Sequence, residues 1–160
     1  MMEEITMKAI RIFSAVLLCM SALCWSQSAK HDIYPAPSQA KADIAAAIKA
    51  APQAHKRVLI LFGANWCPNC VALDKTVHQE AYRTLLDANY LVVHANIGEM
   101  KGTGPKSELA EHYKLDLSKG IPAAVVLNEK GDLLYSGALA APRQPVVETE
   151  FTAFLKKWKP

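Results

Sequence analysis

The sequence contains one pair of cysteines whose spacing suits redox chemistry, within the segment Trp66-Cys67-Pro68-Asn69-Cys70. The apolar run 58–62 before this segment has the pattern of a strand buried on both faces, and the residues after it favour a helix. Cys67 would then lie at the N-terminus of that helix, where free N–H groups and the helix dipole stabilise a thiolate. Cys70 would lie deeper on the same helical face, within disulfide reach. We therefore predict that Cys67 is the nucleophile and Cys70 the resolving thiol.

Two cysteines at this spacing also occur in zinc sites, in haem attachment sites and in structural disulfides. Zinc requires further Cys or His ligands close by, but the five histidines of this chain are scattered along it. Haem attachment requires a histidine directly after the second cysteine, where this chain has Val71. The pattern therefore favours thiol–disulfide exchange, with no metal site and no cofactor beyond the redox-active disulfide of Cys67 and Cys70.

The first 29 residues have the pattern of a secretory signal peptide. Lys8 and Arg11 precede an apolar stretch at 12–25, and small polar residues follow, which predicts cleavage near Ser26 or Ala29. The apolar stretch is short for a membrane span, so an uncleaved anchor is the alternative, and membrane contact is expected only through it. We predict an exported protein, located in the bacterial periplasm.

Composition agrees with one exported redox domain. Removal of residues 1–29 would also remove Cys19 and Cys24, so that one cysteine pair remains as the redox centre in an oxidising compartment. The 160 residues suffice for a single core, and the net charge of +3 is spread without a basic stripe. We therefore expect a monomer that does not bind nucleic acid.

Three segments of the chain resemble the thioredoxin superfamily. Trp66-Cys67-Pro68-Asn69-Cys70 after a buried strand resembles its active site, and Gly120-Ile121-Pro122-Ala123 resembles its cis-proline loop. Gly137-Ala138-Leu139, after the last expected strand, is similar to the turn that closes its substrate groove. The resemblance covers residues 38–158 and implies an α/β thioredoxin fold, a three-layer sandwich with a central mixed sheet flanked by helices.

The resemblance also implies how the substrate would bind. Pro122 is expected to be cis and to face Cys67, which would turn the N–H and C=O of Ile121 outward to pair with an extended substrate. The apolar Trp66 would shape the docking surface beside the thiol. The expected substrate-binding residues are Trp66, Pro68, Asn69, Ile121, Pro122, Ala138 and Leu139.

The chain departs from the thioredoxin pattern at the position of the family's buried aspartate, where it carries Leu61. His94 lies where the lysine partner of that aspartate would be, and it is a candidate proton acceptor for Cys70, the alternative being a packed or solvated histidine. Asp74 and Glu80 could approach the site from the helix, although most helical carboxylates are surface charges. The loop 98–105 is longer than in compact thioredoxins, either for partner specificity or as an unselected insertion.

The function that we predict is a thiol:disulfide oxidoreductase that acts on protein disulfides and is recycled by an upstream electron-transfer partner. Asn69 stands where disulfide-forming oxidants of the Dsb type carry histidine, and Ile121 matches reductases better than isomerases, which favours the reducing direction. The alternatives are an oxidant that introduces disulfides and a metallochaperone that holds Cu(I) with the two thiols.

The remaining sequence predicts the elements that position this site. Residues 30–37 are expected to be an exposed lead-in to a domain at 38–160. Ser38 can cap a helix with Ala42, Ala45 and Ile48 on its buried face and Ile44 alongside. The further expected elements are a strand at 58–64, a helix at 67–77 broken at 78–80 from a second at 81–88, a strand at 90–96, a helix at 107–113, a hairpin of 123–127 with 133–136, and a helix at 145–158 with Val147, Phe151, Phe154, Leu155 and Trp158 inward.

Overall fold

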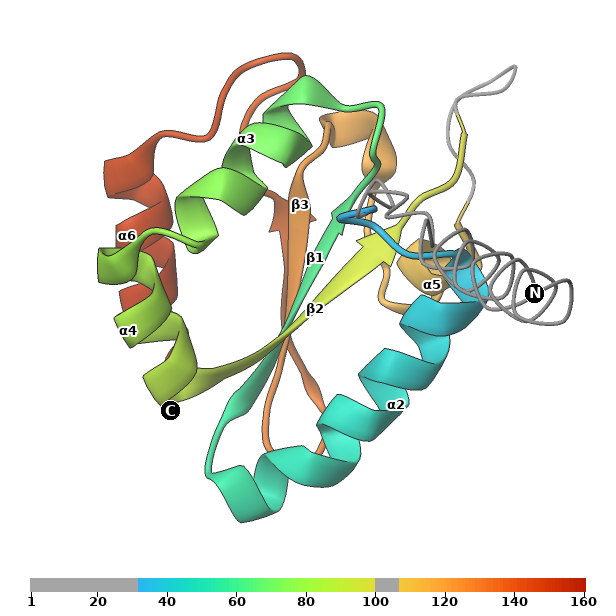
Figure 1. The fold of residues 1–160 in the computed structure, drawn as a ribbon. Helices are drawn as coiled ribbons and strands as arrows, with labels where there is room; N and C mark the ends of the chain where they lie inside the picture. Colours follow the sequence, from blue (N-terminus) through green and yellow to red (C-terminus); the bar gives the residue numbers. More distant parts are fainter. Residues whose placement is uncertain (1–31, 100–106) are drawn as a thin grey trace, which may run out of the picture. The chain divides into compact units, whose positions relative to one another are not determined.

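The computed structural model describes residues 32–99 and 107–160. Its centre is a four-stranded sheet in the order β2-β1-β3-β4 (Figure 1). β2 is parallel to β1, β3 is antiparallel to β1, and β4 is antiparallel to β3, so the sheet is mixed as predicted. The strands are β1 (Arg57–Gly63), β2 (Tyr90–Asn96), β3 (Ala123–Leu127) and β4 (Leu133–Ala138).

Helices cover both faces of the sheet and make the expected three layers (Figure 1). Side chains of β1 alternate between two apolar clusters, with Ile60 and Phe62 on one face and Leu59 and Leu61 on the other. α2 (Pro37–Ala54) and α5 (Glu108–His112) pack on the first face, whereas α3 (Pro68–Val77), α4 (Glu80–Asn89) and α6 (Glu148–Lys157) pack on the second. A short 3-10 helix, η1 (Leu117–Lys119), precedes β3.

The directions of the strands bring two segments that are distant in the sequence to one end of the sheet. The parallel strands β1 and β2 both end there, in register from Arg57 with Tyr90 to Gly63 with Asn96. Because β3 runs the opposite way, its first residue pairs with Phe62 near the end of β1. The loop after β1 and the loop before β3 therefore meet, although they are far apart in the sequence.

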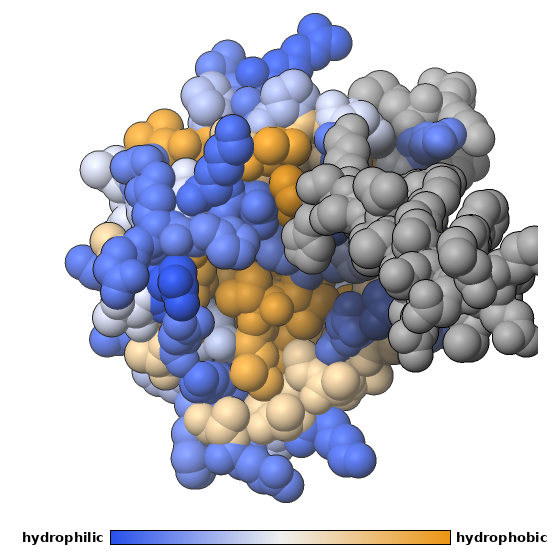
Figure 2. Space-filling view, viewed as in Figure 1, coloured by the Kyte–Doolittle hydropathy of each residue, from blue (hydrophilic) through white to orange (hydrophobic). Residues whose placement is uncertain are grey.

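β2 is an edge strand of the sheet, because β1 is its one neighbour in the strand order. Figure 2 shows apolar atoms in the middle of the viewed face, between α2 and α4, where β2 comes to the surface. Leu91 and Val92 of this strand are half-buried. Figure 2 also shows a smaller apolar area towards the top of the view, and hydrophilic residues cover much of the remaining coloured surface.

The first helix differs from its prediction in its start and in its buried face. It begins at Pro37, and the residue before it, Ala36, forms no side-chain cap, so Ser38 is not the cap. Proline suits the first turn because that turn needs no N–H donor. The buried residues are Ala40, Ile44, Ala47 and Ala51. Ile44 was predicted alongside the buried face and Ile48 packs half-buried on the core, whereas Ala42 and Ala45 are exposed. In an alanine-rich helix the two faces differ little in hydropathy, and the pattern therefore misplaced the face.

The lead-in is not wholly exposed, because Tyr34 is buried with 1% of its surface accessible. Its main chain is hydrogen-bonded to the side chains of Asn65 and Asn96, at the ends of the two parallel strands. The prediction failed here because burial of Tyr34 depends on contacts with residues far along the chain, which a local pattern does not contain.

Two boundaries in the C-terminal part also differ from the prediction. β4 continues to Ala138, so Gly137 and Ala138 lie in a strand and not in a turn after it. Val147 is not inward, since it precedes the first residue of α6 and is 48% exposed. Phe151 and Leu155 do form the buried face of that helix, as predicted.

Two predicted features lie wholly or mostly outside the described residues, namely the signal peptide at 1–29 and the loop 98–105. Within the described ranges, 32–99 and 107–160, none of the helices has both the length and the apolar character that a bilayer crossing requires.

Candidate active site

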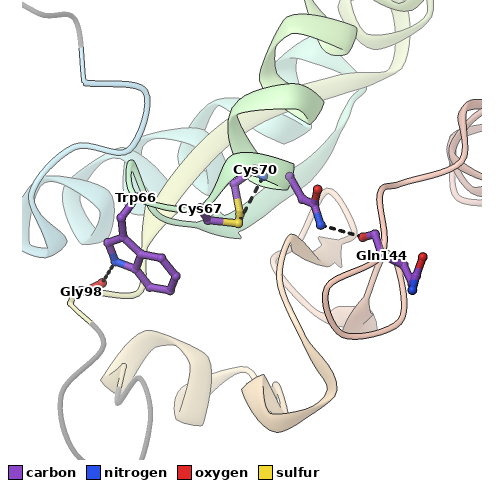
Figure 3. Close-up of a disulfide and its surroundings, with 6 residues drawn as sticks. Trp66, Cys67, Cys70, Gly98 and Gln144 are labelled. Carbon is purple, nitrogen blue, oxygen red and sulfur yellow. Dashed lines mark hydrogen bonds between the residues drawn. A yellow bond between two sulfur atoms is a disulfide. The ribbon is translucent and has the colours of Figure 1, made fainter.

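Cys67 and Cys70 form a disulfide at the start of α3 (Figure 3). Their Cα atoms are 5.2 Å apart, and Pro68 occupies the first helical turn. Cys67 is the N-cap of the helix, and its Sγ accepts a hydrogen bond of 3.2 Å from the backbone N–H of Cys70. Cys67 keeps 5% of its surface accessible, whereas Cys70 is fully buried. The two sulfurs therefore differ in access and in helix position, as the predicted roles require.

Trp66, which precedes the two cysteines, and Asn69, which lies between them, are hydrogen-bonded to two different loops. The Nε1–H of Trp66 donates to the carbonyl oxygen of Gly98 at 2.9 Å, just after β2. The Nδ2 of Asn69 donates to the carbonyl oxygen of Gln144 at 2.8 Å, in the connection between β4 and α6. Figure 3 shows Trp66 and Gly98 on one side of the disulfide and Gln144 on the other. Trp66 is 41% exposed, so it presents an apolar surface beside the thiols.

The loop before β3, which contains Pro122, lies at the same end of the sheet. The peptide bond between Ile121 and Pro122 is cis, and Ile121 packs against the apolar cluster that contains both cysteines. The N–H of Leu139 donates to the carbonyl oxygen of Pro122 at 3.0 Å, which joins this loop to the end of β4. Gly120 has a φ of 111°, a region that favours glycine, and it packs closely on Pro142.

The structure thus places the expected substrate-binding residues in segments at one end of the sheet, the end at which β1 leads into α3. Trp66, Pro68 and Asn69 come with α3, whereas Ile121, Pro122, Ala138 and Leu139 come from the loop before β3 and from the end of β4. Of these, Ala138 pairs with the first residue of β3, Ala123. Their roles in binding remain predictions.

Leu61 and His94 are direct neighbours in the sheet, as the resemblance implied. They pair in the parallel register of β1 and β2, and Leu61 is fully buried in the cluster under α3. His94 is largely buried, and burial lowers the pKa of its imidazole because the charged form loses its hydration. The negative charge of Asp74 opposes that shift, and His78 adds to it. His94 is therefore neutral at neutral pH.

Asp74 is a member of this site that the sequence prediction did not assign to it, although it named Asp74 as a helical carboxylate that could approach the site. Its side chain is only 17% exposed, and its Oδ1 lies 3.4 Å from Nε2 of His94 and 3.6 Å from Nδ1 of His78. It follows Cys70 by one helical turn, a spacing that the sequence could have offered as a signal. Glu80, the other carboxylate considered, is exposed at the start of α4.

Tyr34 is a second residue that the prediction missed. Its ring meets the ring of His94 edge to face, with centroids 5.3 Å apart. Burial raises the pKa of its hydroxyl above the ordinary value, and the negative charge of Asp74 raises it further. Its N–H donates to Oδ1 of Asn65, and its carbonyl accepts from Nδ2 of Asn65 and of Asn96. Nothing in the local sequence distinguishes this tyrosine from an exposed one.

Within the described residues, no group of three or more His, Cys, Asp or Glu side chains is arranged to hold a metal ion. The groups that the structure brings together at this site are the Cys67–Cys70 disulfide, the largely buried carboxylate of Asp74 and the neutral imidazole of His94.

Comparison with known proteins agrees with this geometry. A family model described as thioredoxin-like matches residues 39–129. A disulphide isomerase from Xylella fastidiosa Temecula1 is similar, with 33% identity and a TM-score of 0.60 over 67% of this chain and 79% of that one. The search of curated proteins gave no significant match.

Two further solved structures show the same fold at lower identity. A thioredoxin from Thermus thermophilus is 23% identical, with a TM-score of 0.51 over 78% of this chain and 83% of that one. The C-terminal domain of DsbD from Neisseria meningitidis, in the oxidised form, is 18% identical, with a TM-score of 0.51 over 79% of this chain and 98% of that one.

Proposed function

The chain belongs to the thioredoxin-like family and is a thiol:disulfide oxidoreductase, and from this we propose that it reduces disulfides of exported proteins in the bacterial periplasm. In the proposed cycle, the thiolate of Cys67 attacks a substrate disulfide and forms a mixed disulfide. Cys70 then attacks Cys67, releases the reduced substrate and leaves the Cys67–Cys70 disulfide. An upstream redox partner returns the pair to the dithiol.

The observation that carries this proposal is the asymmetry of the two cysteines at the start of α3. Cys67 is the outer residue and occupies the helix N-cap, where the helix dipole favours its thiolate. Cys70 is fully buried one turn inward and can reach only a partner that is already bonded to Cys67. An outer attacking thiol and an inner resolving thiol are what sequential exchange requires.

The reducing direction is supported by the small number of donors at the Cys67 sulfur. Among residues 32–99 and 107–160, the backbone N–H of Cys70 is its one hydrogen-bond donor. Asn69 donates to Gln144 and not to the sulfur, so it does not stabilise a thiolate there. A less stabilised thiolate makes the dithiol less stable and the pair more reducing. The similar disulphide isomerase supports the same starting state, because isomerisation also begins with attack by a thiolate.

Protein substrates are supported by the surface around the disulfide. Trp66 offers an exposed apolar ring, and the segments of Pro122 and Leu139 lie at the same end of the sheet. This combination suits an extended peptide that adds main-chain contacts to apolar ones. Location in the periplasm is supported by the signal-peptide pattern at 1–29, and a mass measurement on exported protein that begins after Ser26 or Ala29 would establish it.

The deciding experiment is the reduction potential of the Cys67–Cys70 pair, measured by alkylation and mass spectrometry in a dithiothreitol series. We expect a value near that of thioredoxin, about −270 mV, whereas a value near −120 mV would assign the protein to the oxidants. A Cys70→Ser variant serves as the control for alkylation of a single thiol. Titration of the reduced protein with Cu(I), with stoichiometric binding and no redox cycling, would instead support the metallochaperone alternative.

A further inference from the structure

Asp74 of α3 is largely buried and faces two histidines, which sets it apart from an ordinary exposed carboxylate on a helix. It follows Cys70 by one turn of α3, which places the two side chains on the same face of the helix. Its side chain is only 17% exposed, and it points to the imidazoles of His94 on β2 and of His78 at the C-cap of α3. Leu73 and Val77, its neighbours on the buried side of the helix, are apolar. Asp74 is thus a largely buried carboxylate on the same helical face as Cys70.

The charges around Asp74 leave it able to take up a proton. Within the described parts of the chain, neither lysine nor arginine forms an ion pair with it. The groups that face it are His94, His78 and the buried phenol of Tyr34. A carboxylate held in an ion pair with lysine or arginine resists protonation, whereas imidazole rings can themselves accept and donate protons.

His94 supplies an independent observation that points the same way. Its Nε2 atom is buried and has no hydrogen-bond partner among the residues that the structure describes, although Oδ1 of Asp74 lies 3.4 Å away. A buried polar atom without a partner costs free energy, and such atoms are rare in folded proteins. A neutral imidazole nitrogen can accept a hydrogen bond from a protonated carboxyl group. The orphaned nitrogen therefore gains a partner when Asp74 carries a proton.

We propose that Asp74 receives the proton of the Cys70 thiol in the resolving step and that His94 stabilises the protonated carboxyl group. The S–H bond of Cys70 breaks as the carboxylate takes the proton, directly or through one water molecule. The Cys70 thiolate attacks Sγ of Cys67, the Cys67–Cys70 bond forms, and the bond between Cys67 and the substrate breaks. The substrate sulfur leaves with the electron pair and takes a proton from solvent, and Asp74 returns its proton to solvent beside His78, whose side chain is 67% exposed.

Leu61 stands on β1 at the position of the family's buried aspartate, and in this proposal Asp74 on α3 supplies the carboxylate instead. The buried ring of Tyr34 belongs to the same group of side chains, because it meets the ring of His94 edge to face. The inference rests on the proposed function, specifically on Cys70 as the resolving thiol. It applies whether the protein reduces or isomerises its substrates.

The test follows the resolving step alone, with the small disulfide 5,5′-dithiobis(2-nitrobenzoate) as substrate. One equivalent reacts with the reduced protein, and Cys67 releases the first thiolate while Cys70 releases the second, so stopped-flow absorbance separates the two rates. For Asp74→Asn we expect the second rate at pH 6 to fall about 100-fold, within the usual range for general-base catalysis. It should also rise about tenfold per pH unit, whereas the wild-type rate should depend less steeply on pH.

The matched control is Asp87→Asn, the same change at an exposed position on α4, which should leave both rates unchanged. Asp74→Glu keeps the carboxylate and should restore most of the lost rate, and it serves as the second variant if Asp74→Asn does not fold. A second rate in Asp74→Asn that equals or exceeds the wild-type rate at pH 6 would refute the proposal, because the carboxylate would then act only by repelling the thiolate. Release of both thiolates by a Cys70→Ser variant would instead refute the assigned cysteine roles.

Discussion

The main chain of Tyr34 and the side chain of Asn65 exchange two hydrogen bonds, each 3.0 Å long, across 31 residues of sequence. The side chain of Asn96 adds a third bond to the carbonyl of Tyr34, at 3.1 Å. Asn65 directly precedes Trp66, so these bonds connect the segment before α2 to the start of the active-site loop. Through them the N-terminal segment helps to fix where the cysteines lie.

Tyr34→Ala should lower the free energy of unfolding by about 3–5 kcal/mol, the usual cost of deleting a buried aromatic ring. The backbone bonds to Asn65 can persist in this variant, so the loss reports on the ring. Tyr34→Phe, which removes only the hydroxyl group, is the control and should cost far less. Urea unfolding of both variants measures the difference, and equal stability of Tyr34→Ala and wild type would contradict the burial of this ring.

Gly63→Ala should destabilise the protein because the added Cβ would lie 2.5 Å from the ring of Tyr34. The clash should be absent in a background that already carries Tyr34→Ala. We therefore expect the double variant to be more stable than the sum of the two single changes predicts, by about 1 kcal/mol or more. Additive costs in urea unfolding would show that the ring does not lie over Gly63.

Cys67→Ser should abolish turnover, because the outer sulfur makes the first bond with the substrate. Cys70→Ser should instead accumulate a mixed disulfide between Cys67 and the substrate, since the inner thiol that resolves it is missing. Non-reducing electrophoresis and mass spectrometry detect the trapped species. A Cys70→Ser protein that turns over at the wild-type rate is the result that the assigned roles do not allow.

Asn69→His should raise the reduction potential of the cysteine pair by about 30 mV or more, because a cationic imidazole next to Cys67 stabilises its thiolate and hence the dithiol. Asn69→Ala is the matched control, since it removes the bond to Gln144 without adding a charge. The potentials of all three proteins come from a dithiothreitol series. A potential in Asn69→His equal to that of Asn69→Ala would mean that the side chain at this position does not act on the thiolate.

His94 should make the protein less stable as the pH falls through about 6.5, the ordinary histidine pKa. Its pKa is lowered in the folded state, so between the two values the unfolded chain binds more protons and unfolding is favoured. The stability is therefore present above the unfolded pKa, falls by up to about 1.4 kcal/mol per pH unit below it, and levels off below the folded pKa. His94→Gln should show a smaller loss between pH 7 and pH 5 than wild type.

Urea unfolding at several pH values measures this effect. His112→Gln, a change at an exposed histidine of α5, is the control and should keep the wild-type pH dependence. An identical dependence in His94→Gln would show that the imidazole of His94 titrates alike in the folded and unfolded states.

Local sequence patterns were sufficient for the part of the fold that builds the cysteine site. The strand at Tyr90–Asn96 was predicted to the residue, and the break between α3 and α4 lies where polar residues interrupt the apolar pattern. The pairing of Leu61 with His94 followed from the resemblance and is confirmed by the strand register. These features depend on neighbours in sequence or on one parallel pair, which pattern and family together determine.

The parts that the sequence did not reveal depend on contacts between distant residues. Burial of Tyr34 needs Asn65, Asn96 and the space above Gly63, none of which alters the polar pattern around the tyrosine. Asp74 follows the buried Cys70 by one helical turn, but its contact with His94 depends on the position of β2, which the sequence of α3 does not contain. Physical contact across the sheet, rather than residue type, gives these two side chains their setting.

The hydrogen bonds of Tyr34 also determine where the folded unit starts. A shortened protein that begins at Ser38, where sequence patterns place the domain, would keep every helix residue after the first and all four strands. It would still lose the ring above Gly63 and the main-chain partners of Asn65 and Asn96. For protein production and for domain exchange between relatives, the N-terminal boundary therefore belongs before Ile33, with the lead-in treated as part of the redox unit.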